Sequence, residues 1–243
     1  MPLQCLYGKG DVFFMDWFPL LNTVRTALVS TTIVFFLGIF AANRVLTLPR
    51  PARSALDALF TVPLVIPPTV TGWLILRFLG TRHPVGYWMQ ALFGVRLVMT
   101  WQSGVLAAVI VSFPLMYRMA RGAFRRFDED LSDAAQTLGH SELWTFWVIQ
   151  IPVCGQEIFT GVMLAFARAA GEYGATSMVA GYTPGRTATV ASTVYQMWRA
   201  DESGAAGWVF VSIVLSAVFA VLLSLLENGF FHTRRRGEQN LQP

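Results

Sequence analysis

The chain has 243 residues, of which 54% are hydrophobic and only 13% are charged. A soluble domain carries roughly 25% charged residues, so this deficit indicates a protein of the lipid bilayer. The net charge of +4 does not indicate a nucleic-acid partner, because the arginines cluster beside apolar segments, as in oriented membrane proteins. The two cysteines and three histidines are scattered, which predicts neither a disulfide framework nor a metal site.

Five stretches are long and apolar enough to form membrane-spanning helices, which need roughly 20 mostly apolar residues each. We predict that the spans cover residues 17–42, 58–80, 102–120, 152–171 and 207–227. No basic region precedes the first stretch and no cleavage-site pattern follows it, so we expect the first span to stay in the mature protein. The predicted fold is therefore an all-α integral membrane domain.

Prolines interrupt the second predicted span at three positions, Pro63, Pro67 and Pro68. Each lacks a backbone N–H and bends a helix axis. Such breaks are tolerated in a membrane where neighbouring helices or water satisfy the freed carbonyl groups. Two interpretations stay open: a kinked helix that only packs against its neighbours, or a hinge beside a translocation path.

The placement of the arginines predicts the orientation of the chain. The loops at 43–57 and 118–151 and the C-terminal tail together contain ten arginines. The opposite side has five basic residues, which are Lys9, Arg82, Arg96, Arg186 and Arg199. Basic residues concentrate on the cytoplasmic side, so we expect the N-terminus outside and the C-terminus in the cytoplasm. Five spans also require the two termini to lie on opposite sides.

The cytoplasmic loop between the third and fourth spans has the local signals of a short helix. Asp130 is the candidate N-cap, and Asp133 lies in the first turn, where negative charge suits the helix dipole. Gly139 suits the residue after the helix, where the backbone turns left-handed. Ser141 is placed to cap a second, aromatic-rich helix, and Pro152 opens the next span.

Small residues on this predicted helix, Ala134 and Ala135, allow another surface to approach closely. An ordinary amphipathic surface helix is the alternative. The spacing over residues 128–152 resembles the EAA loop of ABC importer permeases, EAA-x3-G-x9-I-x-LP. The chain has Asp-Ala-Ala, three residues, Gly139, nine residues, Ile149, one residue and then Ile151-Pro152. It departs from the pattern twice, with Asp133 for Glu and Ile151 for Leu, and both changes conserve the chemistry.

This resemblance implies a type I ABC importer permease fold, with five transmembrane helices and a cytoplasmic coupling helix. In that family the helix docks into a cleft of the ATPase subunit and couples it to the spans. The implied coupling residues are Asp133, Ala134, Ala135, Gly139, Ile149 and Pro152. The family also pairs two permease subunits, here a homodimer, with two ATPase subunits and an external binding protein in the cytoplasmic (inner) membrane.

The resemblance extends over roughly residues 15–228 and favours one branch of the family. The stretches TVPLVIPPTVTGWLIL and LAFARAAGEYGATSMVAGYTPGRTATVASTVY look like the molybdate permease subunit. Sulfate permeases share a similar FAR-x2-GE-[FY]-GA run. The resemblance therefore implies ATP-driven import of molybdate and tungstate, with sulfate, thiosulfate or another oxyanion as the alternative.

The chain is not expected to be an enzyme itself. Its only lysine, Lys9, is followed by Gly10, whereas a Walker A loop requires Ser or Thr after the lysine. ATP and Mg²⁺ are therefore expected on the partner ATPase, with no cofactor, metal or catalytic residue in this chain. A channel would need a filter of carbonyl or charged rings, and no such segment is evident. A purely structural membrane protein would not need the capped loop.

Arg168 and Glu172 lie four residues apart near the outer end of the fourth span, which is the spacing of a helical ion pair. Charged residues inside a membrane usually face the protein interior or a water-filled cavity. Two interpretations stay open: a structural ion pair, or part of an oxyanion path together with Pro67 and Pro68.

These patterns divide the chain into three predicted regions. Residues 15–228 form the permease domain, and residues 229–243 form a basic cytoplasmic tail. Residues 1–14 add no predicted span and precede the family resemblance, which begins at Met15. We expect them to be dispensable, and translation from Met1 and from Met15 both stay open.

Overall fold

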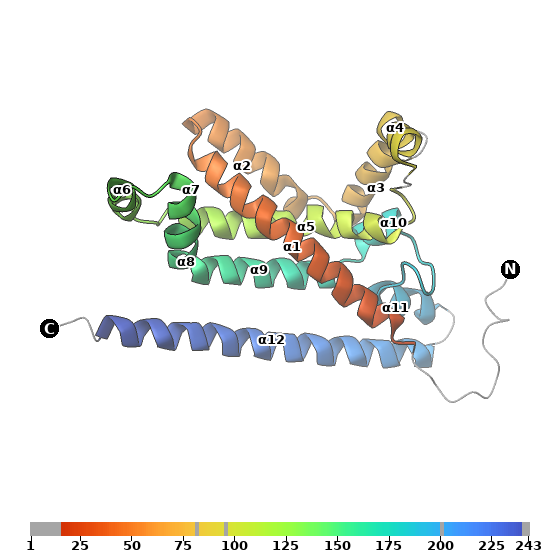
Figure 1. The fold of residues 1–243 in the computed structure, drawn as a ribbon. Coiled ribbons are helices and arrows are strands. Elements are labelled where there is room, and N and C mark those ends of the chain that lie inside the picture. Colours follow the sequence, from red (N-terminus) through yellow and green to blue (C-terminus); the bar gives the residue numbers. More distant parts are fainter. Residues whose placement is uncertain (1–15, 81–82, 95–96, 200–201, 240–243) are drawn as a thin grey trace.

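The computed structural model describes residues 16–80, 83–94, 97–199 and 202–239, and every regular element in these residues is a helix (Figure 1). The predicted all-α class is therefore confirmed. The predicted extension at 1–14 and the alternative start at Met15 lie outside the described residues.

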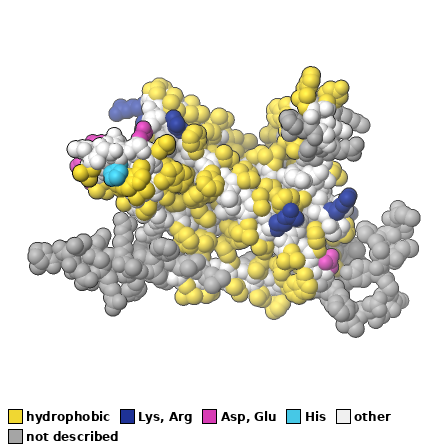
Figure 2. Space-filling view, viewed as in Figure 1, with side chains coloured by type: hydrophobic (Ala, Val, Ile, Leu, Met, Phe, Trp, Pro, Cys, Tyr) yellow, Lys and Arg dark blue, Asp and Glu magenta, His cyan; other side chains and the backbone are white. Residues whose placement is uncertain are grey.

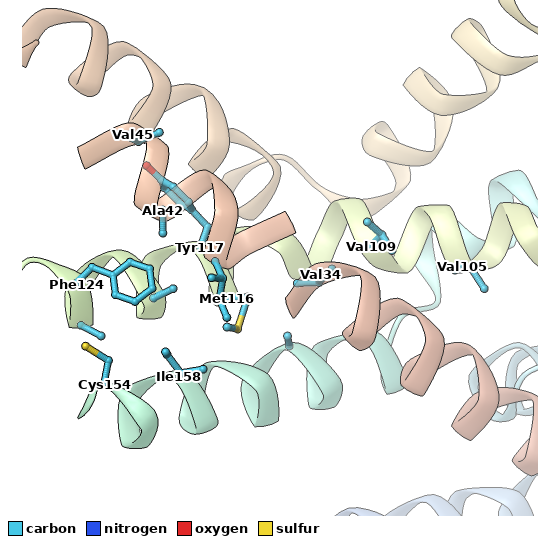
Figure 3. Close-up of a cluster of buried hydrophobic side chains, with 14 residues drawn as sticks. Val34, Ala42, Val45, Val105, Val109, Met116, Tyr117, Phe124, Cys154 and Ile158 are labelled. Atoms are coloured by element: carbon cyan, nitrogen blue, oxygen red, sulfur yellow. The ribbon is translucent and has the colours of Figure 1, made fainter. Parts of the chain in front are cut away.

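Three helices lie side by side and form the centre of the molecule. They are α1 (Phe18–Leu46), α5 (Trp101–Phe124) and α9 (Gly155–Ala170). Buried apolar side chains fill the space between them, among them Val34, Met116 and Ile158 (Figure 3). Small residues let helices approach closely in a membrane. A β-carbon on Gly38 would lie 2.7 Å from the Cγ atom of Met116, so the contact of α1 with α5 depends on this glycine.

The longest helix, α12 (Glu202–Gln239), lies along the outside of this bundle and packs on α11 (Val190–Trp198) and α9. Its apolar side chains largely face outward, with Phe210 68% exposed and Ile213 62% exposed. A helix that is apolar all round is typical of a membrane environment. The helix contains the fifth predicted span and continues without a break into the segment predicted as a tail.

The second predicted span consists of two helices. They are α2 (Arg50–Val65) and α3 (Pro68–Leu79), which meet at 110°. Ile66 and Pro67 between them have extended ψ angles, and Pro68 begins α3, where its missing N–H breaks no helical hydrogen bond. A proline also disfavours helical backbone in the residue before it, so the Pro67–Pro68 pair ends α2. Pro63 is accommodated inside α2.

The fourth predicted span is also part of a bent pair, in which residues Glu142–Val153 and Gly155–Ala170 meet at 78°. Within the described residues, three helices are long and apolar enough to cross a membrane, or up to five if each bent pair counts as one span. The predicted five spans are therefore the upper count.

Two further short helices, like α11, fall below the length of a span, and the sequence pattern does not predict them. They are α4 (Pro84–Phe93) and α10 (Gly174–Val179). All three lie at the end of the bundle where α1 begins (Figure 1). The end of α1, the loop after α5 and the C-terminal end of α12 lie at the opposite end. The three arginine-rich segments therefore share one end of the molecule.

Both α2 and α3 rise away from the central bundle, and a notch separates them (Figure 2). Within α2 no residue is buried, and the helix packs mainly on α5. In contrast, α3 is fixed to α10 by a close contact. A β-carbon on Gly72 would lie 2.9 Å from the Cα atom of Ala175 and 2.9 Å from the Cβ atom of Met178.

Replacing Gly72 with alanine is expected to destabilise this contact. The added methyl group meets backbone atoms of α10, so the two helices have to separate, at a cost of about 1–3 kcal/mol. Gly122→Ala is the matched control, because a β-carbon there meets no atom within 4 Å. Thermal unfolding of the detergent-solubilised chain should give a lower midpoint for Gly72→Ala only. Equal midpoints for both variants would contradict the close contact.

Candidate functional site

The loop after α5 contains the predicted helix, α6 (Glu129–Thr137). Its N-cap is Asp128, not Asp130 as predicted: the Asp128 carboxylate accepts a hydrogen bond from the backbone N–H of Asp130 at 3.1 Å. Asp130 and Glu129 instead occupy the first turn, where their charge suits the helix dipole. Asp133 lies one turn further along. Several acidic residues in a row made the position of the cap ambiguous.

The end of α6 follows the prediction. Gly139 has φ of +90°, in the left-handed range that glycine adopts without strain. The N–H of His140 donates to the carbonyl of Ala135 at 3.1 Å, and the N–H of Gly139 donates to the carbonyl of Gln136 at 2.9 Å. This pair of bonds is the Schellman motif, which satisfies the last carbonyl groups of a helix.

The second predicted helix, α7 (Glu142–Thr145), is capped by Ser141, whose hydroxyl accepts from the N–H of Trp144 at 3.3 Å. It continues as a π-helix, η2 (Phe146–Gln150), and one short turn, α8 (Ile151–Val153). Pro152 therefore lies before the bend and does not open the next helix, which starts at Gly155. A proline ring clashes with the carbonyl four residues earlier in an α-helix. Here that residue lies in the wider π turn.

Two contacts fasten the loop to the central bundle. The ring of Phe146 on η2 packs edge-on against Phe124 at the end of α5, with centroids 5.8 Å apart. Arg126, just after α5, pairs with Glu157 on α9 at 3.4 Å. Thr145 is almost completely buried. These contacts hold the segment that carries α6 against α5 and α9.

The structure separates the two alanines of the predicted coupling helix. Ala135 is buried at 5% exposure, whereas Ala134 is exposed. Of the other predicted coupling residues, Asp133, Gly139 and Pro152 are exposed and Ile149 is half-buried. All six lie in one continuous segment between α5 and α9.

Apolar side chains on this segment are also exposed, and the sequence pattern did not single out Leu138 and Leu143 among them. Leu138 is 80% exposed, Leu143 is 75% exposed and Trp147 is 47% exposed. Exposed apolar side chains gathered on one surface mark interaction sites. Leu131, Ala134 and Leu138 follow helical spacing, which is the signal that could have identified Leu138.

Replacing Gly139 with valine is expected to loosen the end of α6. A β-carbon at this position meets no atom within 4 Å, so the penalty comes only from the positive φ, about 1–2 kcal/mol. Backbone amides of α6 should then exchange hydrogen about 5- to 30-fold faster. Gly139→Asn is the control, since asparagine tolerates this conformation. Unchanged exchange in the valine variant would contradict a structural role for the glycine.

The Arg168–Glu172 spacing gives an ion pair, with 2.6 Å between the guanidinium and the carboxylate. The Glu172 side chain is 1% exposed and that of Arg168 is 28% exposed. The second carboxylate oxygen of Glu172 accepts the N–H of Ala175 at 2.7 Å, which caps the start of α10. The ion pair indicated by the spacing is therefore present, and it links the end of α9 to α10.

The proline break and the ion pair lie close together, although about 100 residues separate them in the sequence. A β-carbon on Gly174, two residues after Glu172, would lie 2.9 Å from the Cβ atom of Pro68. The break between α2 and α3 therefore rests on the turn between α9 and α10. The four residues predicted for the path, Pro67, Pro68, Arg168 and Glu172, belong to one region of the molecule.

A family model described as binding-protein-dependent transport system inner membrane component matches residues 34–232. The molybdenum transport system permease protein ModB of Escherichia coli K12 is 36% identical over 211 residues, covering 86% of this chain and 92% of that protein. A probable sulfate transport system permease protein of Chlorokybus atmophyticus is 31% identical over 202 residues, covering 82% of this chain and 70% of that protein.

Two solved structures share the fold. A chain from the MetNI methionine ABC transporter in inward-facing conformations superposes with a TM-score of 0.67 at 12% identity, covering 90% of this chain and 99% of that chain. A chain from an amino acid ABC transporter gives 0.60 at 20% identity, with 86% and 91% covered. The expected fold of a type I ABC importer permease is therefore confirmed.

Proposed function

Because this chain belongs to the family of binding-protein-dependent transport system inner membrane components, we propose that it is the permease subunit of an ATP-driven molybdate importer. The chain forms the path through the membrane and contributes no catalytic residue. Two ATPase subunits bind ATP and Mg²⁺, and an external binding protein delivers the substrate.

The single observation that carries this proposal is the helix α6. It is capped at both ends, its segment is attached to α5 and α9, and the sequence of this segment has the spacing of the EAA loop. Asp128 and Gly139 fix its two ends, and Ala134 and Leu138 remain exposed on it. A rigid helix with a small residue and an apolar residue on its surface fits a cleft on another protein. We assign that cleft to the ATPase, which moves the spans through this segment.

A homodimer completes the path in this proposal. Both helices that flank the notch carry exposed apolar side chains, including Val65 on α2 at 81% and Trp73 on α3 at 54% exposure. A second copy facing the notch would cover these side chains and enclose a route beside the Pro67–Pro68 break. The Arg168–Glu172 pair stabilises the turn before α10, and this turn contacts Pro68 at the break.

The orientation of the subunit follows from its charge distribution. The arginine-rich end, which includes α6, faces the cytoplasm, where the ATPase and its nucleotide are. The N-terminus and the helices α4, α10 and α11 face outward, where the binding protein docks. The C-terminus is cytoplasmic.

The choice of substrate rests on the relatives and on the residue runs that resemble the molybdate branch. Of the relatives described, the one named for molybdenum is 36% identical and the one named for sulfate is 31% identical. Molybdate and tungstate are tetrahedral dianions of similar size, so we expect both to be transported. Sulfate is the runner-up.

Uptake by the reconstituted complex tests the proposal. Proteoliposomes that contain the permease and its ATPase, supplied with ATP and the cognate binding protein, should accumulate labelled molybdate. Excess unlabelled tungstate should suppress this uptake, whereas equimolar sulfate should not. Competition by sulfate and none by tungstate would move the assignment to sulfate. Failure to accumulate any of the three oxyanions would refute the proposal.

A further inference from the structure

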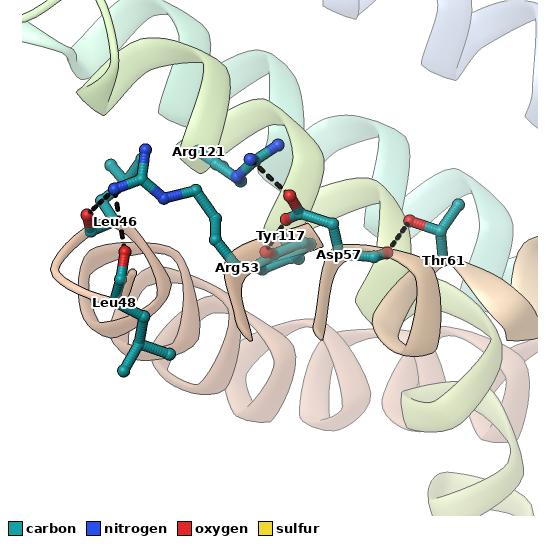
Figure 4. A network of polar contacts seen from close by, with 7 residues as sticks. All are labelled: Leu46, Leu48, Arg53, Asp57, Thr61, Tyr117 and Arg121. Carbon is teal, nitrogen blue, oxygen red and sulfur yellow. Dashed lines mark hydrogen bonds and ion pairs between the residues drawn. The ribbon is translucent and has the colours of Figure 1, made fainter. Parts of the chain in front are cut away.

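The first half of α2 is tied to its neighbours by polar groups (Figure 4). The guanidinium of Arg53 donates to the carbonyl of Leu46 and, at 3.1 Å, to that of Leu48. Leu46 is the last residue of α1 and Leu48 follows its C-cap, so the cation lies at the C-terminal end of α1, where it complements the helix dipole. The start of α2 is thereby anchored to the end of α1.

One turn further along, Asp57 connects α2 to α5. One oxygen of its carboxylate accepts a hydrogen bond from the hydroxyl of Tyr117, and the other pairs with Arg121. Tyr117 is almost completely buried, and the Nε atom of Arg121 is buried without a hydrogen-bond partner. Among the described residues, Asp57 is the carboxylate that pairs with the guanidinium of Arg121. Both of its partners lie on one face of α5.

Aromatic contacts also join α2 to α5. Phe60, three residues after Asp57, packs edge-on against Tyr117 and Phe113, with centroids 5.1 and 5.3 Å away. Beyond it the second half of α2 is largely exposed, with Val62 at 41% and Val65 at 81%. The helix is therefore attached to α5 as far as Phe60, and its last turn before the break at Pro67 is largely exposed.

The helix that holds α2 also leads into the loop that carries α6. Arg121 lies in the last turn of α5, and Phe124 at its end contacts Phe146 of η2. A continuous series of side-chain contacts therefore joins η2 to α5 and α5 to α2. A displacement of the loop at one end of this series acts on α2 at the other.

We propose that Asp57 is a positioning residue that locks α2 to α5, so that movement of the loop carrying α6 also moves α2 and the notch beside it. The inference rests on the proposed ATP-driven transport. It assigns to the Asp57–Tyr117–Arg121 cluster the task of transmitting motion, which a packing contact alone would not perform. The carboxylate suits this task because two directional bonds fix its position in both rotation and translation.

The test compares two arginines that lie one turn apart on α5. Arg121→Gln removes the partner of Asp57, whereas Arg118→Gln removes an exposed arginine for which the structure describes no ion pair. Each variant is reconstituted with the ATPase and binding protein, and assembly, ATP hydrolysis and molybdate uptake are measured. We expect assembled Arg121→Gln complexes to transport about tenfold less molybdate per ATP, within the usual range of coupling between sites. Arg118→Gln should match the wild type.

Tyr117→Phe provides a second, nearly isosteric variant, which deletes only the hydroxyl. This variant is the deciding one if Arg121→Gln does not assemble. A lowered ratio of molybdate uptake to ATP hydrolysis then supports the proposed role of Asp57, and a wild-type ratio overturns it. A wild-type ratio in assembled Arg121→Gln complexes would also overturn it. These outcomes differ from a failure of the proposed function, in which the wild-type complex itself would transport no molybdate.

Discussion

Ala134→Arg is expected to weaken association with the ATPase and, with it, to reduce ATP-driven uptake. Ala134 is exposed on α6, and its small side chain leaves room for close approach of another surface. An arginine there holds the two surfaces apart and buries a charge without a partner. We expect affinity for the ATPase to fall roughly 10- to 100-fold, which corresponds to about 1.4–2.8 kcal/mol.

Copurification of the two subunits at graded ATPase concentrations measures this loss. Ala134→Ser is the matched control and should bind normally, because it keeps a small side chain at the same position. Membrane insertion should be unchanged in both variants. Ala135→Arg is a poorer test than the sequence alone indicated, since Ala135 is buried within its own chain and its replacement would disturb the segment itself. Normal ATPase binding by Ala134→Arg would refute the docking assignment.

Neutralising one member of the Arg168–Glu172 pair should cost more stability than neutralising both. Glu172→Gln leaves the guanidinium without its carboxylate, and Arg168→Gln leaves a buried carboxylate without its cation. Breaking a buried ion pair in this way costs about 3–5 kcal/mol, whereas replacing both members by uncharged residues leaves no charge without a partner and costs less. The double variant should therefore unfold at a higher temperature than either single variant.

The same variants separate the two interpretations of Arg168. If the pair is structural only, the double variant should recover both thermal stability and molybdate uptake. If Arg168 also contacts the oxyanion, stability should recover and uptake should not. Additive destabilisation, with the double variant the least stable of the three, would contradict the ion pair itself.

Local signals predicted the ends of the short helices well. Gly139 and Ser141 act through their own backbone and immediate neighbours, so a single sequence is enough to assign them. The N-cap was misplaced by two residues because acidic side chains at Asp128 and Asp130 both suit the start of a helix. The Arg168–Glu172 pair was also predictable, since both residues lie on one helical face.

Features that depend on distant parts of the chain were not predictable. The prolines indicated a break in the second span, but its 110° angle depends on how α3 packs on α10 through Gly72 and Gly174. The cluster around Asp57 was missed because its partner Tyr117 is 60 positions away. A lone carboxylate at the edge of an apolar stretch gave the only local indication.

The π-helix η2 sets the rotational register between the proposed docking surface and the bundle. A π turn contains one residue more than an α turn, and each residue rotates an α-helix by about 100°. If the same five residues, Phe146–Gln150, wound as an α-helix instead, they would turn the chain further and rotate α6 and α7 about the axis of the segment by roughly that amount. The exposed face with Leu138 would then point away from its present direction, although every side chain on it would be unchanged. The direction in which this surface faces is thus set by the π winding of the five-residue stretch that joins it to the bundle.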